Sequence, residues 1–173
     1  MVTLIAATDT SVTDTIWALL QTVPDPEIPV VSVVELGIVQ NVSWQDGTAI
    51  ITVTPTYSGC PATAVIALSI QQTLRENGFE TVEIKTQLSP AWTTDWITEE
   101  ARKKLKAYGI APPVDGTSCA GSLMPQPQQT VAIACPRCAS ENTERVSQFG
   151  STPCKASYRC KDCLEPFDYF KSF

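Results

Sequence analysis

The pattern of apolar and polar residues predicts a helix, a β-hairpin, a second helix, a strand and a third helix before residue 110. Apolar side chains recur at helical spacing after Ser11 and after Pro61, and β-branched residues flank Asp46-Gly47, a dipeptide typical of hairpin turns. A strand, a crossover helix and a following strand form a parallel pair, so the sheet is expected to be mixed. The expected helices cover 11–23, 62–77 and 98–108, and the expected strands cover 38–44, 48–54 and 79–85.

The composition of the chain changes after residue 110. The stretch 111–130 is rich in Pro, Gly, Ser and Gln, which is typical of a linker between domains. Short strand-like segments follow, over 130–134, 145–149, 157–159 and 167–170. We therefore expect an α+β fold class, with a small mixed-sheet α/β domain over 1–110, a linker over 111–130 and a four-cysteine ribbon module over 131–173.

Cys60 is predicted to lie where the second strand ends and the second helix begins. Pro61 suits the first position of a helix, which makes Cys60 the expected N-cap. A sulfur in that position faces unpaired backbone N–H groups and the positive end of the helix dipole, and this environment favours a thiolate. Such a thiolate can act as a nucleophile, a metal or cluster ligand, or a redox group. The alternative is a half-buried residue that fills a turn.

The sequence contains no histidine, so a Cys-His nucleophile pair is excluded and a ligand role for Cys60 is favoured. Two carboxylates, Asp25 and Glu27, occur in a proline-rich loop before the first strand, although carboxylates in solvated loops usually have no specific role. In the loop after them, Ser32 is expected to cap a single turn through Glu35. Two tryptophans near residue 94 either line a pocket or pack under the third helix.

Composition and charge limit the classes of function. No apolar run reaches the roughly 20 residues that span a bilayer, and the N-terminal residues lack the pattern of a signal peptide, so a cytoplasmic, reducing compartment is expected. There, seven cysteines indicate metal ligands and free thiols rather than disulfides. Residues 1–130 carry 6 Lys and Arg against 13 Asp and Glu. This acidic body argues against nucleic acid as the principal partner.

Four cysteines form the most specific motif in the sequence: two C-x-x-C turns, Cys135 with Cys138 and Cys160 with Cys163, separated by 21 residues. Two such turns supply four sulfur ligands for one tetrahedral ion, which is the pattern of a structural zinc ribbon. Iron is the alternative ion, because four thiolates suit both metals. A module of about 40 residues is too small to fold without help, so the ion is expected to supply much of its folding free energy.

Two further thiols have no assigned role. Cys154 lies in the ribbon module and is expected to pack or remain free, although a metal site that includes it is an alternative. Cys119 lies in the predicted linker, where it is either an exposed thiol near Cys60 or a residue without function.

Several motifs resemble those of one known family. In the first domain they resemble the small domain shared by SufT-like and eukaryotic cytosolic iron–sulfur assembly factors. Together with the tryptophan segment and the ribbon, nearly the whole chain is similar to the PaaD (PaaJ) family. The motifs are Asp25-Pro26-Glu27-Ile28-Pro29, Glu35-Leu36-Gly37-Ile38-Val39, Thr54-Pro55-Thr56-Tyr57-Ser58-Gly59-Cys60-Pro61, Ser89-Pro90-Ala91-Trp92, Cys135-Pro136-Arg137-Cys138, Phe149-Gly150-Ser151-Thr152 and Glu165-Pro166-Phe167-Asp168.

The resemblance implies an accessory role in bacterial phenylacetate degradation. Members of this family accompany a multicomponent phenylacetyl-CoA epoxidase, which has a di-iron oxygenase and an iron–sulfur reductase, and they are regarded as factors that mature its iron centres. On this pattern Cys60 is the ligand or transfer thiol for iron or a cluster, with Asp25 and Glu27 shaping its surroundings. The expected partners are the epoxidase subunits and the iron–sulfur assembly machinery, with a homodimer as a further possibility and no membrane partner.

Two other functions are kept as alternatives. One is an integral epoxidase subunit in which Cys60 has a structural or covalent role. The other is a nucleic-acid adaptor that uses the ribbon, where aromatic residues accompany the cations Arg137, Arg145, Lys155, Arg159 and Lys161.

Overall fold

The computed structural model describes residues 9–57, 59–114 and 132–171. The chain divides into two compact units, Met1–Pro90 and Ala91–Phe173. The first unit contains a three-stranded sheet and the second a four-stranded sheet that carries the paired cysteines. The expected α+β class with a four-cysteine ribbon is therefore confirmed.

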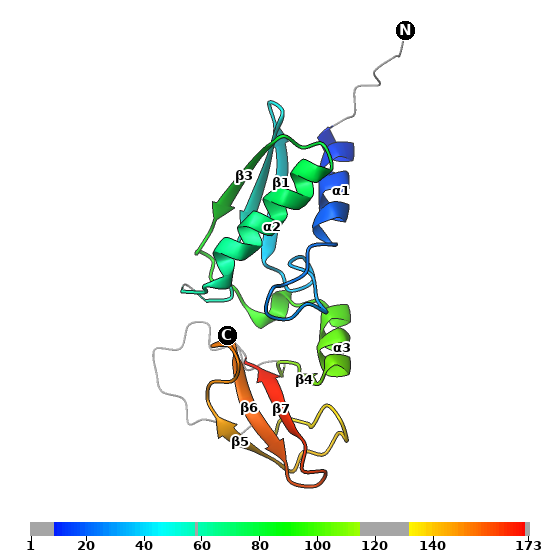
Figure 1. The fold of residues 1–173 in the computed structure, drawn as a ribbon, viewed down its shortest axis with the longest axis vertical. Helices are drawn as coiled ribbons and strands as arrows, with labels where there is room; N and C mark the ends of the chain where they lie inside the picture. The colour runs from blue at the N-terminus through cyan, green and yellow to red at the C-terminus, as the bar shows by residue number, and fades with distance from the viewer. Residues whose placement is uncertain (1–8, 58, 115–131, 172–173) are drawn as a thin grey trace. The chain divides into compact units, whose positions relative to one another are not determined.

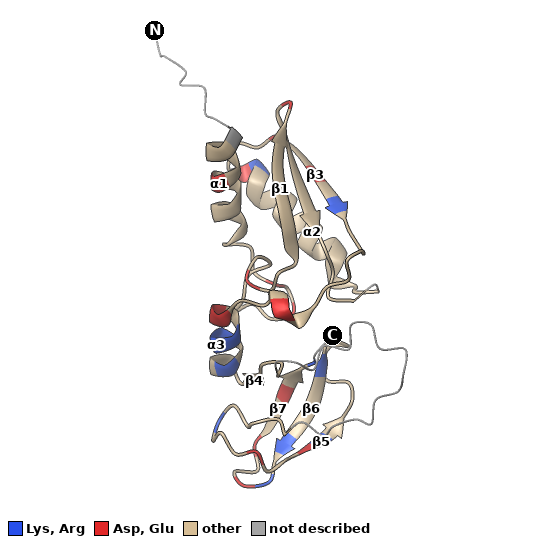
Figure 2. Ribbon diagram, turned by 180° about the vertical axis from the view of Figure 1, so that it is seen from behind, with Lys and Arg blue, Asp and Glu red and all other residues tan. Residues whose placement is uncertain are grey.

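The first unit is a mixed sheet covered by helices. Its strands lie in the order β1-β2-β3, with β1 and β2 antiparallel and β2 and β3 parallel, as the sequence pattern predicts. Figures 1 and 2 view the unit from opposite sides and show α2 crossing one face of the sheet, with α1 beside it. The elements are α1 (Asp9–Leu20), β1 (Val39–Gln45), β2 (Thr48–Val53), α2 (Ala62–Glu76) and β3 (Thr81–Thr86).

Local signals for the turns agree well with the structure. Asp46 and Gly47, which join β1 to β2, have φ angles of 49° and 78°, as a primed hairpin turn requires. Gly78 follows α2 with a φ of 91°, and the N–H of Phe79 returns to the carbonyl of Leu74 at 3.0 Å. Helix α2 therefore ends in a left-handed stop that glycine adopts without steric cost.

The start of α1 differs from the prediction. The sequence pattern favours Ser11 as the N-cap, but the helix begins at Asp9, and the carbonyl of Ser11 accepts a hydrogen bond from the Thr15 hydroxyl at 2.9 Å. Ser11 therefore lies inside the first turn. Ser11 and Asp14 have the spacing of a capping box but do not form one, because the helix already begins at Asp9.

Fully buried aliphatic side chains hold α1 and α2 against the sheet. Each helix contributes a pair four residues apart, and β2 contributes Ile51 from the centre of the sheet. All five expose none of their surface, namely Ile16, Leu20, Ile51, Ile70 and Leu74. Because residues four apart lie on one helix face, this core fixes the orientation of α2 and the position of the turn that precedes it.

The second unit contains the ribbon sheet, whose strands lie in the order β4-β7-β6-β5. Neighbouring strands are antiparallel, except that β4 is parallel to β7. The elements are η1 (Thr94–Trp96, a short 3-10 helix), α3 (Glu99–Tyr108), β4 (Ile110–Ala111), β5 (Thr143–Ser147), β6 (Lys155–Cys160) and β7 (Pro166–Phe170). The expected strand over 130–134 is not formed in its described part, residues 132–134, and the two-residue β4 pairs with β7 instead.

The residues between Ala91 and β4 group with the ribbon in the second compact unit. Trp92 is buried, and its ring centroid lies 6.0 Å from that of Phe170 in β7. The Arg102 guanidinium in α3 donates to the carbonyls of Thr94 at 3.0 Å and Pro113 at 2.7 Å. The contact between Trp92 and Phe170 joins residues far apart in the sequence, so it leaves no local signal in the sequence pattern.

Candidate functional site

Four cysteines from two turns converge in the second unit. The first pair precedes β5, while Cys160 is the last residue of β6 and Cys163 lies in the following turn. All four sulfurs lie within 4.8 Å of one another. The Cys135 and Cys163 sulfurs are 3.7 Å apart, and those of Cys138 and Cys160 are 3.5 Å apart. The structure therefore brings together the four residues that the C-x-x-C spacing predicts.

The geometry of this cysteine quartet fits one metal ion. Four thiolates about 2.3 Å from a central ion, at the corners of a tetrahedron, lie about 3.8 Å from one another. The separations of 3.5 and 3.7 Å are close to this value. Four protein sulfurs complete the coordination shell, so a bound ion would have no open position for water or substrate. The donor set suits an ion that stabilises the fold.

Backbone groups favour the thiolate form at one of these sulfurs. The N–H of Cys163, whose nitrogen lies 3.5 Å from the Cys160 sulfur, is the main cause that lowers the pKa of Cys160 to about 7. Burial and hydrogen bonds with the other sulfurs raise the pKa of Cys163 to about 12, so the quartet releases protons when it binds a metal as thiolates.

A carboxylate connects the two cysteine turns. Asp162, between Cys160 and Cys163, accepts hydrogen bonds from the hydroxyl of Ser140 and from the side-chain amide of Asn142, the latter at 2.8 Å. These two hydrogen bonds lower the pKa of the Asp162 carboxyl. Sequence reasoning did not single out Asp162, and the only signal was an acidic residue inside a cysteine pair.

Each cysteine turn is followed by a residue in the left-handed conformation. Ala139 follows Cys138 with a φ of 61°, and Leu164 follows Cys163 with a φ of 63°. Glycine often occupies these positions in related knuckles, because it adopts a positive φ without steric cost. The backbone thus adopts the knuckle conformation even though both residues carry a Cβ.

The remaining described thiol of the second unit lies outside the quartet. Cys154 is buried, and its sulfur is 2.9 Å from the hydroxyl oxygen of Thr152. The expectation that Cys154 packs outside the metal shell agrees with this position. Cys119 lies outside the described residues.

Cys60 lies in the turn between β2 and α2 and is half-buried. Its N–H donates to the Tyr57 carbonyl at 3.1 Å, and its own carbonyl accepts from the N–H of Thr63 at 3.3 Å. Helix α2 begins at Ala62 with Pro61 as N-cap, and no side chain caps it. The expectation that Cys60 is the N-cap is therefore wrong by one residue, because Pro61 flanks the helix instead of starting it.

Side chains of the loop that precedes β1 accept hydrogen bonds from the backbone of the same loop. One oxygen of Asp25, a buried residue, accepts from the N–H groups of Glu27 at 2.9 Å and Ile28 at 2.8 Å. Ser32 and Glu35 cap each other's backbone N–H groups at 3.1 and 2.9 Å, as predicted. Asp25 therefore has a structural role in this loop, and Glu27 is half-buried beside it.

Among the residues that the structure describes, only the cysteine quartet gathers three or more potential metal-ligating side chains. Cys60, Asp25 and Glu27 do not form such a group. Within the described residues, Cys60 therefore has no preformed group of three such side chains around it.

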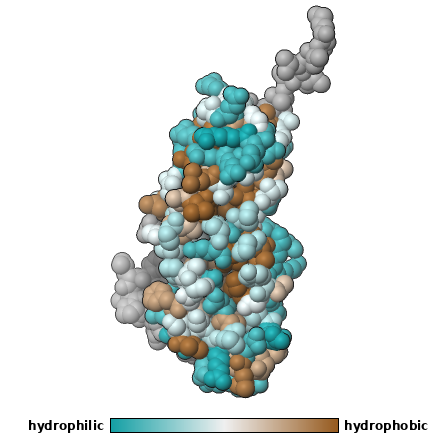
Figure 3. Space-filling model, in the orientation of Figure 1, coloured by the Kyte–Doolittle hydropathy of each residue, from teal (hydrophilic) through white to brown (hydrophobic). Residues whose placement is uncertain are grey.

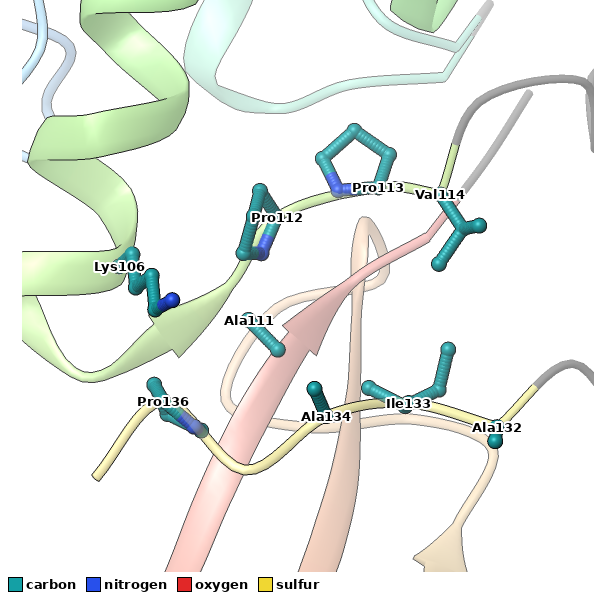
Figure 4. Close-up of a pocket in the computed structure, with 9 residues that line it drawn as sticks. All are labelled: Lys106, Ala111, Pro112, Pro113, Val114, Ala132, Ile133, Ala134 and Pro136. Carbon is teal, nitrogen blue, oxygen red and sulfur yellow. The ribbon is translucent and has the colours of Figure 1, made fainter. Parts of the chain in front are cut away.

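A small cavity lies in the second unit between β4 and the segment that leads to Cys135 (Figure 4). Its volume is about 190 Å³, and its lining is apolar apart from Lys106. Pockets that bind drug-sized ligands usually measure about 300 to 1,000 Å³. This cavity is too small and too poor in polar groups to be a substrate site.

Three of the five cations proposed for nucleic-acid binding are paired with carboxylates of the ribbon. The nitrogens and oxygens of these pairs lie 3.2, 3.6 and 3.2 Å apart, in Arg137–Glu165, Lys155–Asp168 and Lys161–Glu144. Paired cations contribute less to phosphate binding, which disfavours the nucleic-acid alternative. Within the described ranges, no helix has the length and apolar character needed to cross a membrane.

Comparison with family models assigns a class to each half of the chain. Residues 13–86 match a family described as iron-sulfur cluster assembly protein, and residues 122–171 match the PaaD zinc beta ribbon domain. The protein is thus an iron–sulfur assembly-type domain followed by a zinc-ribbon module.

Individual relatives identify the family more closely. The chain is 53% identical over 156 residues, covering 90% of both chains, to an Escherichia coli (strain K12) protein provisionally named as a subunit of 1,2-phenylacetyl-CoA epoxidase. The chain belongs to this PaaD family of epoxidase-associated proteins. It is also 37% identical to an Fe-S protein maturation auxiliary factor of Porphyromonas gingivalis (strain ATCC BAA-308 / W83), over 50% of this chain and 84% of that one.

A solved structure supports the fold of the first unit. The crystal structure of a domain of unknown function, DUF59, from Bacillus anthracis superposes with a TM-score of 0.52 at 29% identity. The match covers 56% of this chain and 93% of that one.

Proposed function

We propose that this protein assists the maturation of iron–sulfur or di-iron centres in a phenylacetyl-CoA epoxidase, and that Cys60 binds the iron or cluster in transit. In this role it is a cytoplasmic accessory factor rather than a catalytic subunit. The observation that carries the proposal is the position of Cys60. It is a half-buried thiol after the central strand of a domain that matches the iron–sulfur assembly family.

The surroundings of Cys60 suit transfer better than permanent storage. Within the described residues, Cys60 belongs to no group of three or more metal-ligating side chains. An ion held there would share its coordination with a donor or client protein, and it could leave when that protein dissociates. Asp25 and Glu27 contribute by fixing the shape of the neighbouring loop, which we propose borders the transfer site.

The helix that follows Cys60 offers a surface for such a partner. Residues 62–74 of α2 contain no charged side chain, and Val65 and Leu68 are 48% and 65% exposed. Figure 3 shows apolar side chains gathered where α2 lies in Figure 1. The cores of protein interfaces are depleted of charged residues, so this helix face suits contact with a donor, a client or a second copy of the chain.

The cysteine quartet has a separate role in this proposal. We assign it to one zinc ion that stabilises the ribbon, because the four-sulfur set is complete and the separations fit a tetrahedral ion. Iron at this position is the alternative, and elemental analysis distinguishes the two.

A co-production experiment tests the proposal. The epoxidase is produced in cells with the wild-type chain, with Cys60→Ser or with Tyr108→Ala, which removes an exposed side chain outside both sites. The expected result is a large loss of epoxidase iron and turnover with Cys60→Ser only. Equal iron and turnover with all three chains would contradict the proposal.

The name of the Escherichia coli relative favours a second candidate, an integral epoxidase subunit. Turnover of purified, iron-loaded epoxidase with and without this protein separates the two. An accessory factor leaves the turnover unchanged when it is removed, whereas an integral subunit is required in every assay.

A further inference from the structure

We propose that the loop between β5 and β6, residues 148–154, is a docking site for an epoxidase subunit that offers an apolar pocket bordered by carboxylates. The inference rests on the proposed function only for the choice of partner. The loop displays an exposed phenylalanine on a backbone that several hydrogen bonds hold in place, and the ammonium of Lys171 lies over its ring.

The apolar side chains at this site are unusually exposed. Phe149 in the loop is 62% exposed, and Val146 at the end of β5 is 65% exposed. The register of β5 on β6 shifts between Arg145 and Ser147, which places Val146 in a bulge. Exposed aromatic residues in a defined geometry are the side chains that most often dominate binding energy at interfaces.

Backbone hydrogen bonds fold the loop back on the start of β6. The N–H of Gly150 donates to the carbonyl of Lys155 at 2.8 Å, and the N–H of Lys155 donates to the carbonyl of Thr152 at 3.0 Å. The hydroxyl of Ser147 accepts from the N–H of Phe149 at 3.2 Å. The backbone around Phe149 is therefore ordered before any partner binds, which reduces the entropic cost of binding.

The loop also lies close to β7 at Gly150, and this contact further restricts its backbone. A Cβ on Gly150 would lie 2.9 Å from Asp168 Oδ1, so a larger residue would not fit without a shift. Asp168 is itself held by the buried Lys155 ammonium at 3.6 Å and by the Ser151 hydroxyl at 3.2 Å. Because Gly150 has no side chain, the loop can pack directly against the ion pair of Lys155 and Asp168.

One lysine lies over the exposed ring, and a second cation occurs in the neighbouring strand. The Lys171 ammonium lies 4.6 Å from the centroid of Phe149 and 3.5 Å from the carbonyl oxygen of Gln148. Arg145, before the bulge, is exposed. The nearest acidic residue in β5, Glu144, pairs with Lys161 at 3.2 Å. A partner with carboxylates around an apolar pocket complements this arrangement, because charge complementarity increases association and selects the partner.

The edge of the sheet extends the same surface. β5 is the terminal strand in the order β4-β7-β6-β5, and four of its five residues are exposed. Edge strands present backbone groups to other proteins. Phe149, Val146 and the β5 edge can therefore contact one partner.

Affinity measurements with each purified epoxidase subunit test the inference, using the zinc-loaded full-length chain. Phe149→Ala is expected to weaken binding to one subunit by roughly 10- to 30-fold, as for an aromatic hot spot. Tyr108→Ala is the matched control, because it removes an aromatic residue of the same unit that is 55% exposed and lies outside the loop. Arg145→Gln is expected to reduce the salt dependence of binding.

Two further variants separate docking from folding and from iron transfer. Gly150→Ala retains the phenylalanine but displaces the loop, so it should weaken binding while metal content and the unfolding midpoint of the first unit stay unchanged. In the absence of iron, Cys60→Ser should bind like the wild type even if it fails in maturation, because no ion is then shared between Cys60 and the subunit. Failure of the wild-type chain to bind any subunit, or equal affinities of the wild type and Phe149→Ala, would overturn the inference.

Discussion

At the scale of single residues, the cysteine turns carry strain that the metal site tolerates. Ala139 and Leu164 have φ angles of 61° and 63°, and a left-handed conformation costs an L-residue with a Cβ roughly 1 to 2 kcal/mol. Leu164 is also 59% exposed, so its side chain contributes little packing. Both residues are therefore positions where glycine is expected to stabilise the ribbon.

We predict that Leu164→Gly stabilises the second unit by about 0.5 to 1 kcal/mol, because it relieves the positive φ and loses little packing. Denaturant unfolding of the metal-loaded chain measures the change. Leu164→Ala is the control, since it removes the exposed side chain and retains the strain. A gain of equal size in both variants would show that exposure, and not backbone strain, is the cause.

The lowered pKa of Asp162 predicts that the stability of the second unit depends on pH. Its hydrogen bonds to Ser140 and Asn142 lower its pKa, so its stabilising effect is complete above about pH 4, the ordinary pKa of a free Asp. The effect is lost as the pH falls through the lowered folded-state value. Between pH 6 and 8, Asp162→Asn should release metal roughly tenfold faster than the wild type, a typical effect for a residue that supports metal ligands.

Metal release to a chromogenic chelator measures this rate. The difference between Asp162→Asn and the wild type should stay constant from pH 8 to 6. Since thiol protonation also releases metal in acid, only the difference between the two proteins reports on the carboxylate. Identical rates at neutral pH would mean that Asp162 does not support the cysteine turns.

At the scale of elements, the segment 91–111 connects metal binding by the cysteine quartet to the folding of the second unit. Trp92 packs against Phe170 of β7, and Arg102 joins Thr94 to Pro113, so these contacts tie the segment to the ribbon sheet. The metal and the core stabilise the same folded state. Loss of the core should therefore weaken the metal site without any change in its ligands.

We predict that Trp92→Ala destabilises the second unit by about 3 to 5 kcal/mol and weakens metal retention, as expected for truncation of a large buried aromatic residue. Trp44→Ala is the matched control, because Trp44 stacks edge-on against Phe79 in the first unit, with ring centroids 5.6 Å apart. Chelator competition on both variants provides the measurement. Metal retention that falls with Trp44→Ala and not with Trp92→Ala would contradict the assignment of residues 91–111 to the ribbon.

The sequence pattern predicts most elements because their signals are local. Asp46-Gly47 determines a hairpin turn, Gly78 and Gly109 end helices, and the cysteine spacing identifies the quartet. Strand β4 and the packing of Trp92 depend on contacts with residues of β7, which no local pattern contains. The same reason applies to Asp162 and to the loop around Phe149, whose roles arise only when distant strands pair.

At the scale of the whole molecule, the protein joins two modules with different tasks. The first unit places one thiol after its central strand, beside a helix face without charges. The second unit uses four thiols to complete a small fold and displays Phe149 on its surface. In our account, the first module handles iron in transit and the second, stabilised by its own ion, recognises the client.

Elemental analysis of protein purified without oxygen tests this division of tasks most directly. Wild type, Cys60→Ser and Cys154→Ala are compared after production in iron-supplied cells. The account predicts about one zinc ion per chain in all three proteins, as expected for one four-cysteine site, and iron that is lost only from Cys60→Ser. Iron that persists in Cys60→Ser, or zinc that disappears with it, would contradict the account.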